Sequence, residues 1–121
     1  MKISVIRENN IEIAVLESEH ILICDVQSAL DLFATVDYET GCSRMIINKS
    51  SICEEFFDLS TRIAGEVLQK FINYKRKIAI VGDFSAYKNK SLKDFIYESN
   101  NGKDIYFLSD REQAIAKLSM E

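Results

Sequence analysis

The chain has 121 residues, of which 47% are hydrophobic and 28% charged, and it contains four glycines and no proline. This apolar content excludes a disordered chain, and the small number of glycines excludes a collagen-like one. No apolar run approaches the roughly 20 residues that span a bilayer, and the N-terminus has no apolar block of the signal-peptide type. We therefore expect a soluble, cytoplasmic protein in which residues 1–121 form a single domain.

Charge and cysteine content exclude further classes of protein. Fifteen basic and nineteen acidic residues give a net charge of -4, which argues against general binding to nucleic acid or to an anionic membrane. Cys24, Cys42 and Cys53 are odd in number and widely spaced, which indicates buried or half-buried reduced thiols rather than a disulfide framework or a CxxC motif. The only histidine, His20, has no cysteine beside it and is expected in an exposed turn. We therefore predict no metal and no cofactor.

Two amphipathic patterns open the chain. Residues 3–5 and 11–15 alternate between apolar and polar side chains, which predicts two strands. Asn9 and Asn10 lie between them, and asparagine tolerates the left-handed backbone of a tight turn, so we expect a β-hairpin. Asp25 is a good N-cap for the amphipathic helix that follows it.

Helices and strands then alternate. Met45–Asn48 is predicted to be a short buried strand. From Ser51 to Ile72 the apolar residues have helical spacing, which indicates one long helix, or a short helix followed by a longer one that starts near Asp58 or Ser60.

The last third of the chain repeats the alternation. Ile78–Val81 is apolar on both faces, as parallel central strands are. A helix is expected over residues 92–99, a last strand over Ile105–Leu108, and a last helix whose inner face is formed by Ala114, Ile115 and Leu118. The order is ββαβαβαβα, which predicts an α/β fold with a mainly parallel sheet, opened by a β-hairpin and connected by right-handed crossovers.

In an open parallel sheet, ligands bind beyond the carboxyl ends of the strands. Polar residues follow the predicted strands at these positions, and a ligand site at this rim would be built from Asp83, Ser85, Lys49 and Asp25. Asp83 directly follows Gly82 at the end of the most buried strand, so it is either a loop cap or the best single candidate for a site.

Other polar residues are expected to have structural roles. Ser51, Ser91 and Ser109 each begin a capping-box pattern at a predicted helix start. An acidic cluster near the first of these could hold a cation, but such clusters more often stabilise a helix start. The members of this cluster are Glu54, Glu55 and Asp58. Gly65 lies inside a predicted helix, and close packing of that helix on the sheet or on a partner would explain it.

No enzyme motif is present. The chain has no GxGxxG, no GxxxxGK[ST] and no GxSxG sequence. No serine or cysteine is placed beside the single histidine, so no nucleophile–base pair and no catalytic residue can be named. The sequence therefore favours a protein that is not an enzyme.

Five stretches of the chain carry a resemblance to a known family. They begin at Asp25 (DVQSALDL), Tyr38 (YETGC), Phe56 (FFDLST), Gly82 (GDFS) and Phe95 (FIYESN). Together they resemble the small bacterial domain-of-unknown-function family 4180. This family has no assigned activity, so the resemblance implies no function.

The order of elements is similar to that of the STAS domain, the fold of anti-sigma-factor antagonists. In that family, a serine at the start of the helix after the third strand is phosphorylated by a partner kinase, and the phosphate switches partner binding. The resemblance makes Ser60 the counterpart of this serine, with Asp58 as the preceding acid and Thr61 as the next hydroxyl. Leu59 replaces the first serine of the family motif, and Thr61-Arg62 replaces its glycine step. The alternative is that Ser60 is a helix N-cap or an ordinary surface residue.

Two main hypotheses for the function follow. The first is a non-catalytic, STAS-like binding or regulatory module that acts through a protein partner, with a homodimer as one form. The second is a small-molecule-binding protein or enzyme whose site lies at the carboxyl rim of the sheet. A third, an assembly unit, rests only on tyrosines that could lie in an interface. These tyrosines are Tyr38, Tyr74, Tyr87 and Tyr97.

Overall fold

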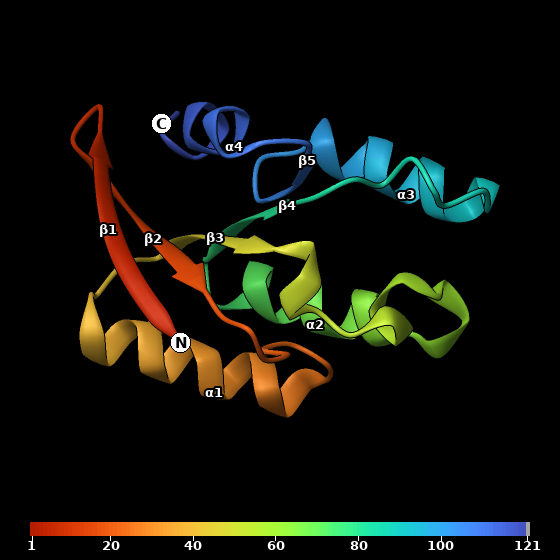
Figure 1. The fold of residues 1–121 in the computed structure, drawn as a ribbon, viewed down its shortest axis with the longest axis horizontal. Coiled ribbons are helices and arrows are strands. Elements are labelled where there is room, and N and C mark those ends of the chain that lie inside the picture. Colours follow the sequence, from red (N-terminus) through yellow and green to blue (C-terminus); the bar gives the residue numbers. More distant parts are fainter. Residues whose placement is uncertain (121) are drawn as a thin grey trace.

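Strands and helices alternate along the chain in the predicted order (Figure 1). The computed structural model describes residues 1–120. The strands are β1 (Lys2–Glu8), β2 (Ile11–Glu17), β3 (Arg44–Asn48), β4 (Lys77–Val81) and β5 (Ile105–Leu108). The helices are α1 (Val26–Glu39), α2 (Ile63–Asn73), α3 (Lys90–Asn100) and α4 (Arg111–Leu118). Within the described residues, none of these helices has the length and apolar character to cross a membrane.

All five strands form one sheet in the order β1-β2-β3-β4-β5. β1 and β2 are antiparallel, with Lys2 opposite Glu17 and Glu8 opposite Ile11, and the other neighbours are parallel. The two asparagines of the turn, at positions 9 and 10, have φ of 54° and 66°. The predicted hairpin and the mainly parallel α/β sheet are therefore confirmed.

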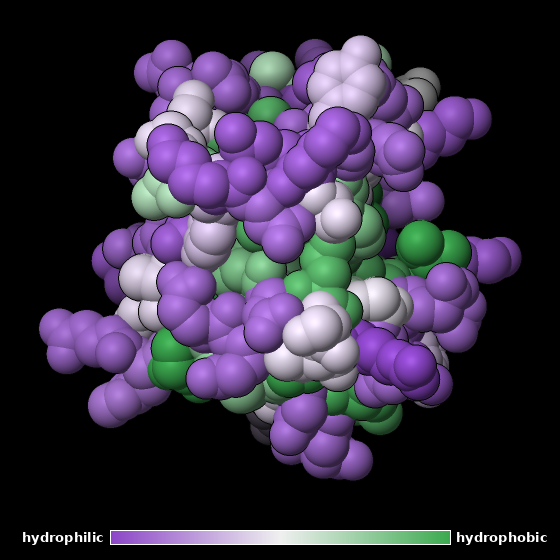
Figure 2. Space-filling view, turned by 90° about the vertical axis from the view of Figure 1, so that its right-hand side faces the viewer, coloured by the Kyte–Doolittle hydropathy of each residue, from purple (hydrophilic) through white to green (hydrophobic). Residues whose placement is uncertain are grey.

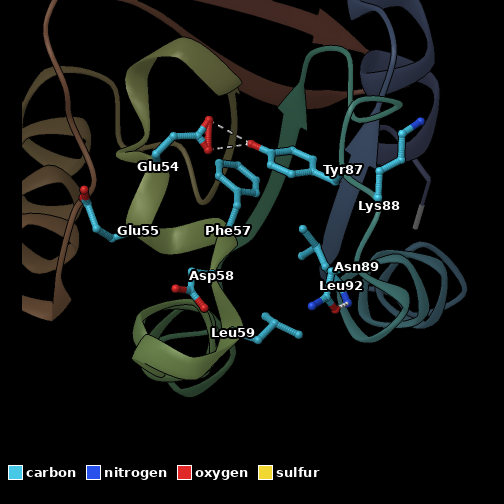
Figure 3. A pocket seen from close by; sticks show the side chains of 9 residues that line it. All are labelled: Glu54, Glu55, Phe57, Asp58, Leu59, Tyr87, Lys88, Asn89 and Leu92. Carbon is cyan, nitrogen blue, oxygen red and sulfur yellow. Dashed lines mark hydrogen bonds between the residues drawn. The ribbon is translucent and has the colours of Figure 1, made fainter.

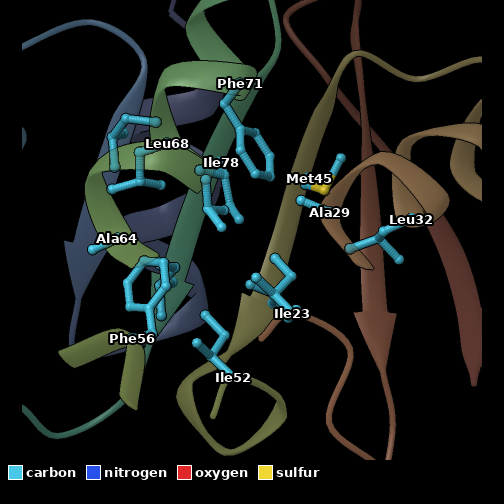
Figure 4. Close-up of a cluster of buried hydrophobic side chains, with 14 of the residues drawn as sticks. Ile23, Ala29, Leu32, Met45, Ile52, Phe56, Ala64, Leu68, Phe71 and Ile78 are labelled. Atoms are coloured by element: carbon cyan, nitrogen blue, oxygen red, sulfur yellow. The ribbon is translucent and has the colours of Figure 1, made fainter. Parts of the chain in front are cut away.

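The helices cover the two faces of the sheet unequally (Figure 1). Each crossover joins neighbouring strands, so right-handed connections bring α1, α2 and α3 to the same face. The larger core lies between these helices and the sheet and includes Met45, Phe71 and Ile78 (Figure 4). On the opposite face, Ala114 and Leu118 of α4 form the smaller core with apolar side chains of the strands.

The prediction of one long helix from Ser51 is wrong, and the alternative of a short helix followed by a longer one near Asp58 or Ser60 is closer to the structure. Three short 3₁₀ turns occupy this region, and α2 begins only at Ile63. The turns are η1 (Lys49–Ser51), η2 (Glu54–Phe57) and η3 (Leu59–Thr61). Arg62 follows them with φ 67°, a left-handed conformation that a continuous α-helix cannot contain.

Backbone hydrogen bonds to the segment before α1 also prevent this segment from forming an α-helix. Ile52 forms an isolated parallel bridge with Ile23, and the Cys53 amide donates to the Ile23 carbonyl at 3.1 Å. These bonds use backbone groups that an α-helix would pair with one another. The buried side chains Ile52 and Phe56 are still part of the core, so their spacing reflects burial and not helix formation.

The cysteines differ from the prediction in the same region. Cys24 and Cys53 form a disulfide with their Cα atoms 5.1 Å apart, so the expectation of reduced thiols is wrong for both. Only Cys42 is free, and it is buried. The pair meets because the segment before α1 runs beside the segment before η2, and the 29-residue separation matches no spacing motif.

Two of the predicted capping boxes are wrong in register. The α3 N-cap is Asn89 and the α4 N-cap is Asp110, and each accepts a hydrogen bond from the backbone amide three residues later. Ser91 lies inside α3, and Ser109 precedes the cap of α4. Ser51 is buried and begins no α-helix. The caps are thus Asx side chains, two residues before Ser91 in α3 and one residue after Ser109 in α4.

Two other predictions have opposite outcomes. Asp25 is the N-cap of α1 and forms a capping box with Ser28, as expected, although the partner of that box was not predicted. Gly65 is exposed, and a Cβ added there would meet nothing within 4 Å. The prediction of close packing of this helix on the sheet at Gly65 is therefore wrong, while packing on a partner stays a prediction.

Candidate functional site

The carboxyl ends of the parallel strands form the face on which the candidate site lies. Lys49 directly follows β3, and Gly82 directly follows β4. Tyr87 lies in the connection from β4 to α3, while Glu54 begins η2. The crossover after β3 and the loop after β4 therefore bring these side chains together at one rim of the sheet.

A lysine, a glutamate and a tyrosine form the polar centre of the site. The Tyr87 hydroxyl donates to the Glu54 carboxylate, at 3.0 Å from Oε1 and 2.8 Å from Oε2. Lys49 Nζ lies 3.7 Å from Glu54 Oε1. The carboxylate thus joins two groups that come from the connections on either side of β4.

Aromatic rings lie beneath this polar group. Phe57 and Tyr87 are stacked, with ring centroids 5.3 Å apart and planes inclined by 19°. Lys49 Nζ lies 5.0 Å from the Tyr87 centroid and 5.6 Å from the Phe57 centroid. An ammonium at such distances is attracted by the electron-rich ring faces, so the lysine is held by both rings and by Glu54.

These contacts change the acidity of the two groups. The Tyr87 oxygen beside the ammonium raises the pKa of Lys49, and the Glu54 carboxylate adds to this while partial burial opposes it. Burial raises the pKa of Tyr87; the bond to Glu54 adds to that effect and Lys49 opposes it. Near neutral pH the lysine is therefore charged and the tyrosine protonated, so the tyrosine serves as a hydrogen-bond donor and not as a base.

An open groove of about 490 Å³ runs beside this centre, between the η2–η3 segment and the start of α3 (Figure 3). Its residues are Glu54, Glu55, Phe57, Asp58, Leu59, Tyr87, Lys88, Asn89 and Leu92. In the close-up, Tyr87 reaches across to Glu54, while Asp58 and Lys88 lie on opposite sides of the groove. Figure 2 shows apolar surface in the middle of this side of the molecule, with hydrophilic side chains above and below it.

The residues predicted to form a ligand rim are only partly brought together. Asp83 accepts hydrogen bonds from the Ser85 hydroxyl at 2.6 Å and the Ser85 amide at 2.9 Å. Both bonds lower the pKa of Asp83, with a smaller effect from Lys49, so these three residues are neighbours. Asp25 instead caps α1, where its side chain accepts a hydrogen bond from the Ser28 amide. Asp83 has the loop-cap geometry that was one of its two predicted roles.

The predicted switch residues lie on the acidic side of the groove. Ser60 is exposed, and its hydroxyl donates to Asp58 Oδ1 at 2.7 Å. The Thr61 hydroxyl donates to the backbone carbonyls of Glu55 and Asp58, each at 2.8 Å. Asp58, and not Ser60, is the N-cap, and it caps η3. The Ser60 hydroxyl is therefore accessible, whereas the Thr61 hydroxyl satisfies the main chain.

The acidic cluster is not gathered around one point. Glu54 binds Tyr87, and Asp58 binds Ser60, so two of its three carboxylates have protein partners. Glu55 lies near the disulfide, with one ligand atom each from Cys24, Cys53 and Glu55 within 4.8 Å of one another. While the disulfide is formed, neither sulfur is a thiolate, so this group offers a metal only the carboxylate.

The partners of Lys49 were not found from the sequence. Glu54 was assigned to a helix start, and Tyr87 was noted only as a tyrosine that could lie in an interface. The two are 33 residues apart, and no fixed spacing connects them. The rule that ligands bind beyond the carboxyl ends of parallel strands predicted Lys49 and Asp83 as site residues. That rule does not locate Glu54, which lies in η2.

Comparison with known proteins places the chain in a family. No curated protein and no solved structure shows a match to it. Residues 8–118 match the family described as "Domain of unknown function (DUF4180)", and this match extends over β2 to α4 and includes every residue of the groove. The chain therefore belongs to the DUF4180 family.

Proposed function

We propose that the protein is a non-catalytic cytoplasmic binding module, similar to STAS domains in its regulatory logic, that holds a segment of a protein partner in the groove beside Tyr87. The single observation that carries this proposal is the form of the groove. Its lining combines buried or half-buried apolar side chains with exposed polar ones, and Ser60, whose side chain is exposed, directly follows the lining residue Leu59.

The lining of the groove favours a peptide segment. Phe57 and Leu92 are 5% and 3% exposed, and with the half-buried Leu59 they form an apolar base for one or two partner side chains. Asp58 and Lys88 lie on opposite sides (Figure 3) and can bind polar groups of a partner main chain or side chain. An open groove suits an extended segment, whereas small molecules are usually held in more enclosed cavities.

Ser60 supplies a means of regulation. Its hydroxyl donates a hydrogen bond to Asp58. Phosphorylation would remove this bond and add a charge of about -1.5 to -2 beside the Asp58 carboxylate. The like charges would repel one another, so we expect η3 to rearrange. Because η3 contains Leu59, phosphorylation would change the apolar base of the groove and with it the affinity for the partner.

The alternative is a small-molecule or substrate site built from Lys49, Asp83 and Ser85. Their proximity at the rim favours it, since Lys49 contributes to the lowered pKa of Asp83. However, the lysine is already held by Glu54 and two rings, and the aspartate by Ser85. A ligand would have to displace these contacts, so the geometry supports this alternative less well.

Affinity measurements on a co-purifying partner test the proposal. The partner is captured with the wild type, and its affinity is then measured for Leu59→Arg, Ser60→Ala and Ser60→Asp, with Ser91→Ala as a control on the exposed face of α3. We expect Leu59→Arg to abolish binding and Ser60→Asp to change the affinity at least severalfold, while Ser60→Ala and the control bind as the wild type does. Equal affinities for all four variants would contradict the proposal.

A further inference from the structure

The two edges of the sheet are built differently. At β5, the Asn100 side chain donates to the Phe107 carbonyl at 3.0 Å and accepts from the Phe107 amide at 2.7 Å, so the last residue of α3 closes that edge. Among residues 1–120, β1 pairs with β2 alone, and no backbone bond of a turn, loop or cap reaches it. Figure 1 shows β1 at the outer end of the sheet, far from α3.

The turn determines which groups of β1 are open. In a hairpin closed by two residues, the residues that flank the turn exchange both of their backbone hydrogen bonds, and this alternates along the strand. Glu8 and Ile11 flank the turn here. The even-numbered residues of β1 therefore bond to β2, while Ile3, Val5 and Arg7 direct their amides and carbonyls outward.

The sequence of β1 is complementary to itself in antiparallel pairing. With Val5 opposite Val5 of a second copy, Lys2 lies opposite Glu8 of that copy, and Ile3 lies opposite its Arg7. The open backbone groups then meet as hydrogen-bonded pairs, which gives on the order of six hydrogen bonds across the two strands. A charge pair of opposite sign forms at each end, and opposite charges directly across a strand pair are stabilising.

Exposure and composition of the strand agree with this pairing. Val5 is 45% exposed in the single chain, although β-branched residues are most stable when packed against a cross-strand neighbour. β1 contains no proline that would block a further strand. An edge of seven residues is thus left open at one end of a sheet whose other end is closed by Asn100.

We infer that two copies of the chain associate through antiparallel pairing of their β1 edges around Val5, which joins the two sheets into one. The groove lies at the carboxyl ends of the parallel strands, beside the start of α3, so this dimer leaves it free. The interface therefore stands apart from the proposed partner site, and either can fail without the other.

Exchange of charges tests the interface. Lys2→Glu and Glu8→Lys each place like charges opposite one another twice, and we expect each to weaken self-association roughly tenfold, measured by sedimentation equilibrium. An equimolar mixture of the two variants restores both opposite-charge pairs and should form heterodimers as tightly as the wild type forms homodimers. A wild type that stays monomeric at millimolar concentration, or a mixture that associates no better than either variant, would overturn the inference.

A cross-link tests the register. Val5→Cys places two sulfurs opposite each other across the two-fold axis, so an oxidising glutathione buffer should convert the protein to a covalent dimer. Arg7→Cys is the matched control, because each new sulfur then faces Ile3 of the other copy and lies about four residues, or roughly 13 Å, from its equivalent. Equal cross-linking of both variants, or none with Val5→Cys, would overturn the register.

Discussion

Gly82 and Lys49 approach so closely that a methyl group does not fit between them: a Cβ at position 82 would lie 2.6 Å from Lys49 Cβ. The first atom of the lysine side chain cannot swing away without its backbone. Glycine at this position therefore lets η1 pass over the end of β4, and this contact places Lys49 above Phe57 and Tyr87.

Gly82→Ala is expected to destabilise the protein by about 1–3 kcal/mol, because overpacking forces the backbone near Lys49 to shift. Gly65→Ala is the matched control: its position in α2 is exposed and the space around it is open. We expect the control to be neutral or up to about 1 kcal/mol more stable. The free energies of unfolding come from urea denaturation, and equal effects at the two sites would contradict the close contact.

Reduction of the Cys24–Cys53 disulfide should lower the free energy of unfolding by about 3–4 kcal/mol, because the cross-link closes a long loop in the unfolded chain. The same loss is expected for Cys24→Ser, and that variant should no longer respond to reductant. Thermal unfolding with and without a phosphine reductant measures both effects. A wild type that is insensitive to reductant would show that the two sulfurs are not bonded.

Asn100→Ala leaves the Phe107 amide and carbonyl without their side-chain partner, and we expect a loss of about 1–3 kcal/mol. Asn101→Ala is the control, since the Asn101 side chain is exposed and donates only to the Tyr97 carbonyl. Hydrogen exchange of the Phe107 amide should rise in the first variant and stay unchanged in the second. An unchanged rate in both would show that Asn100 does not close the β5 edge.

The hydrogen bonds from Ser60, first from its hydroxyl and then from its amide, hold the pKa of Asp58 below the ordinary value of 3.8. Because the folded-state pKa is lowered, the ionised carboxylate stabilises the native state above that ordinary value, and this contribution is lost as the pH falls through the folded-state pKa. In Ser60→Ala the pKa of Asp58 should rise towards 3.8, as measured by carbon-detected NMR titration. The pKa of Asp83, which Ser85 lowers, serves as the internal reference and should not move.

Much of the fold could be predicted because its elements follow regular patterns. The sequences of β1 and β2 alternate in polarity, β4 is an apolar run, and α4 has one apolar face. Each of these patterns indicates one type of element, and the order of the elements determines the topology. The region between β3 and α2 could not be predicted in this way. Its buried residues have helical spacing, but the left-handed Arg62 and the disulfide interrupt the helix, and neither leaves a local signal.

The site was predictable only where it depends on the strand ends. Lys49 and Asp83 follow β3 and β4, and the rule for parallel sheets locates both. The contact between Glu54 and Tyr87 depends instead on how two long connections pack against each other. The order of helices and strands along the chain does not determine that packing. Ser60 was identified by resemblance alone, and the structure adds its exposure and its bond to Asp58.

Photo-cross-linking in cells that make the protein tests the proposed binding groove most directly. A benzophenone side chain replaces Lys88, which borders the groove, or Gln113, which is exposed on α4. We expect a discrete cross-linked protein of one mass from position 88, lost when Leu59→Arg is added, and no such product from position 113. The same products from both positions, or none from position 88, would contradict a partner segment in the groove.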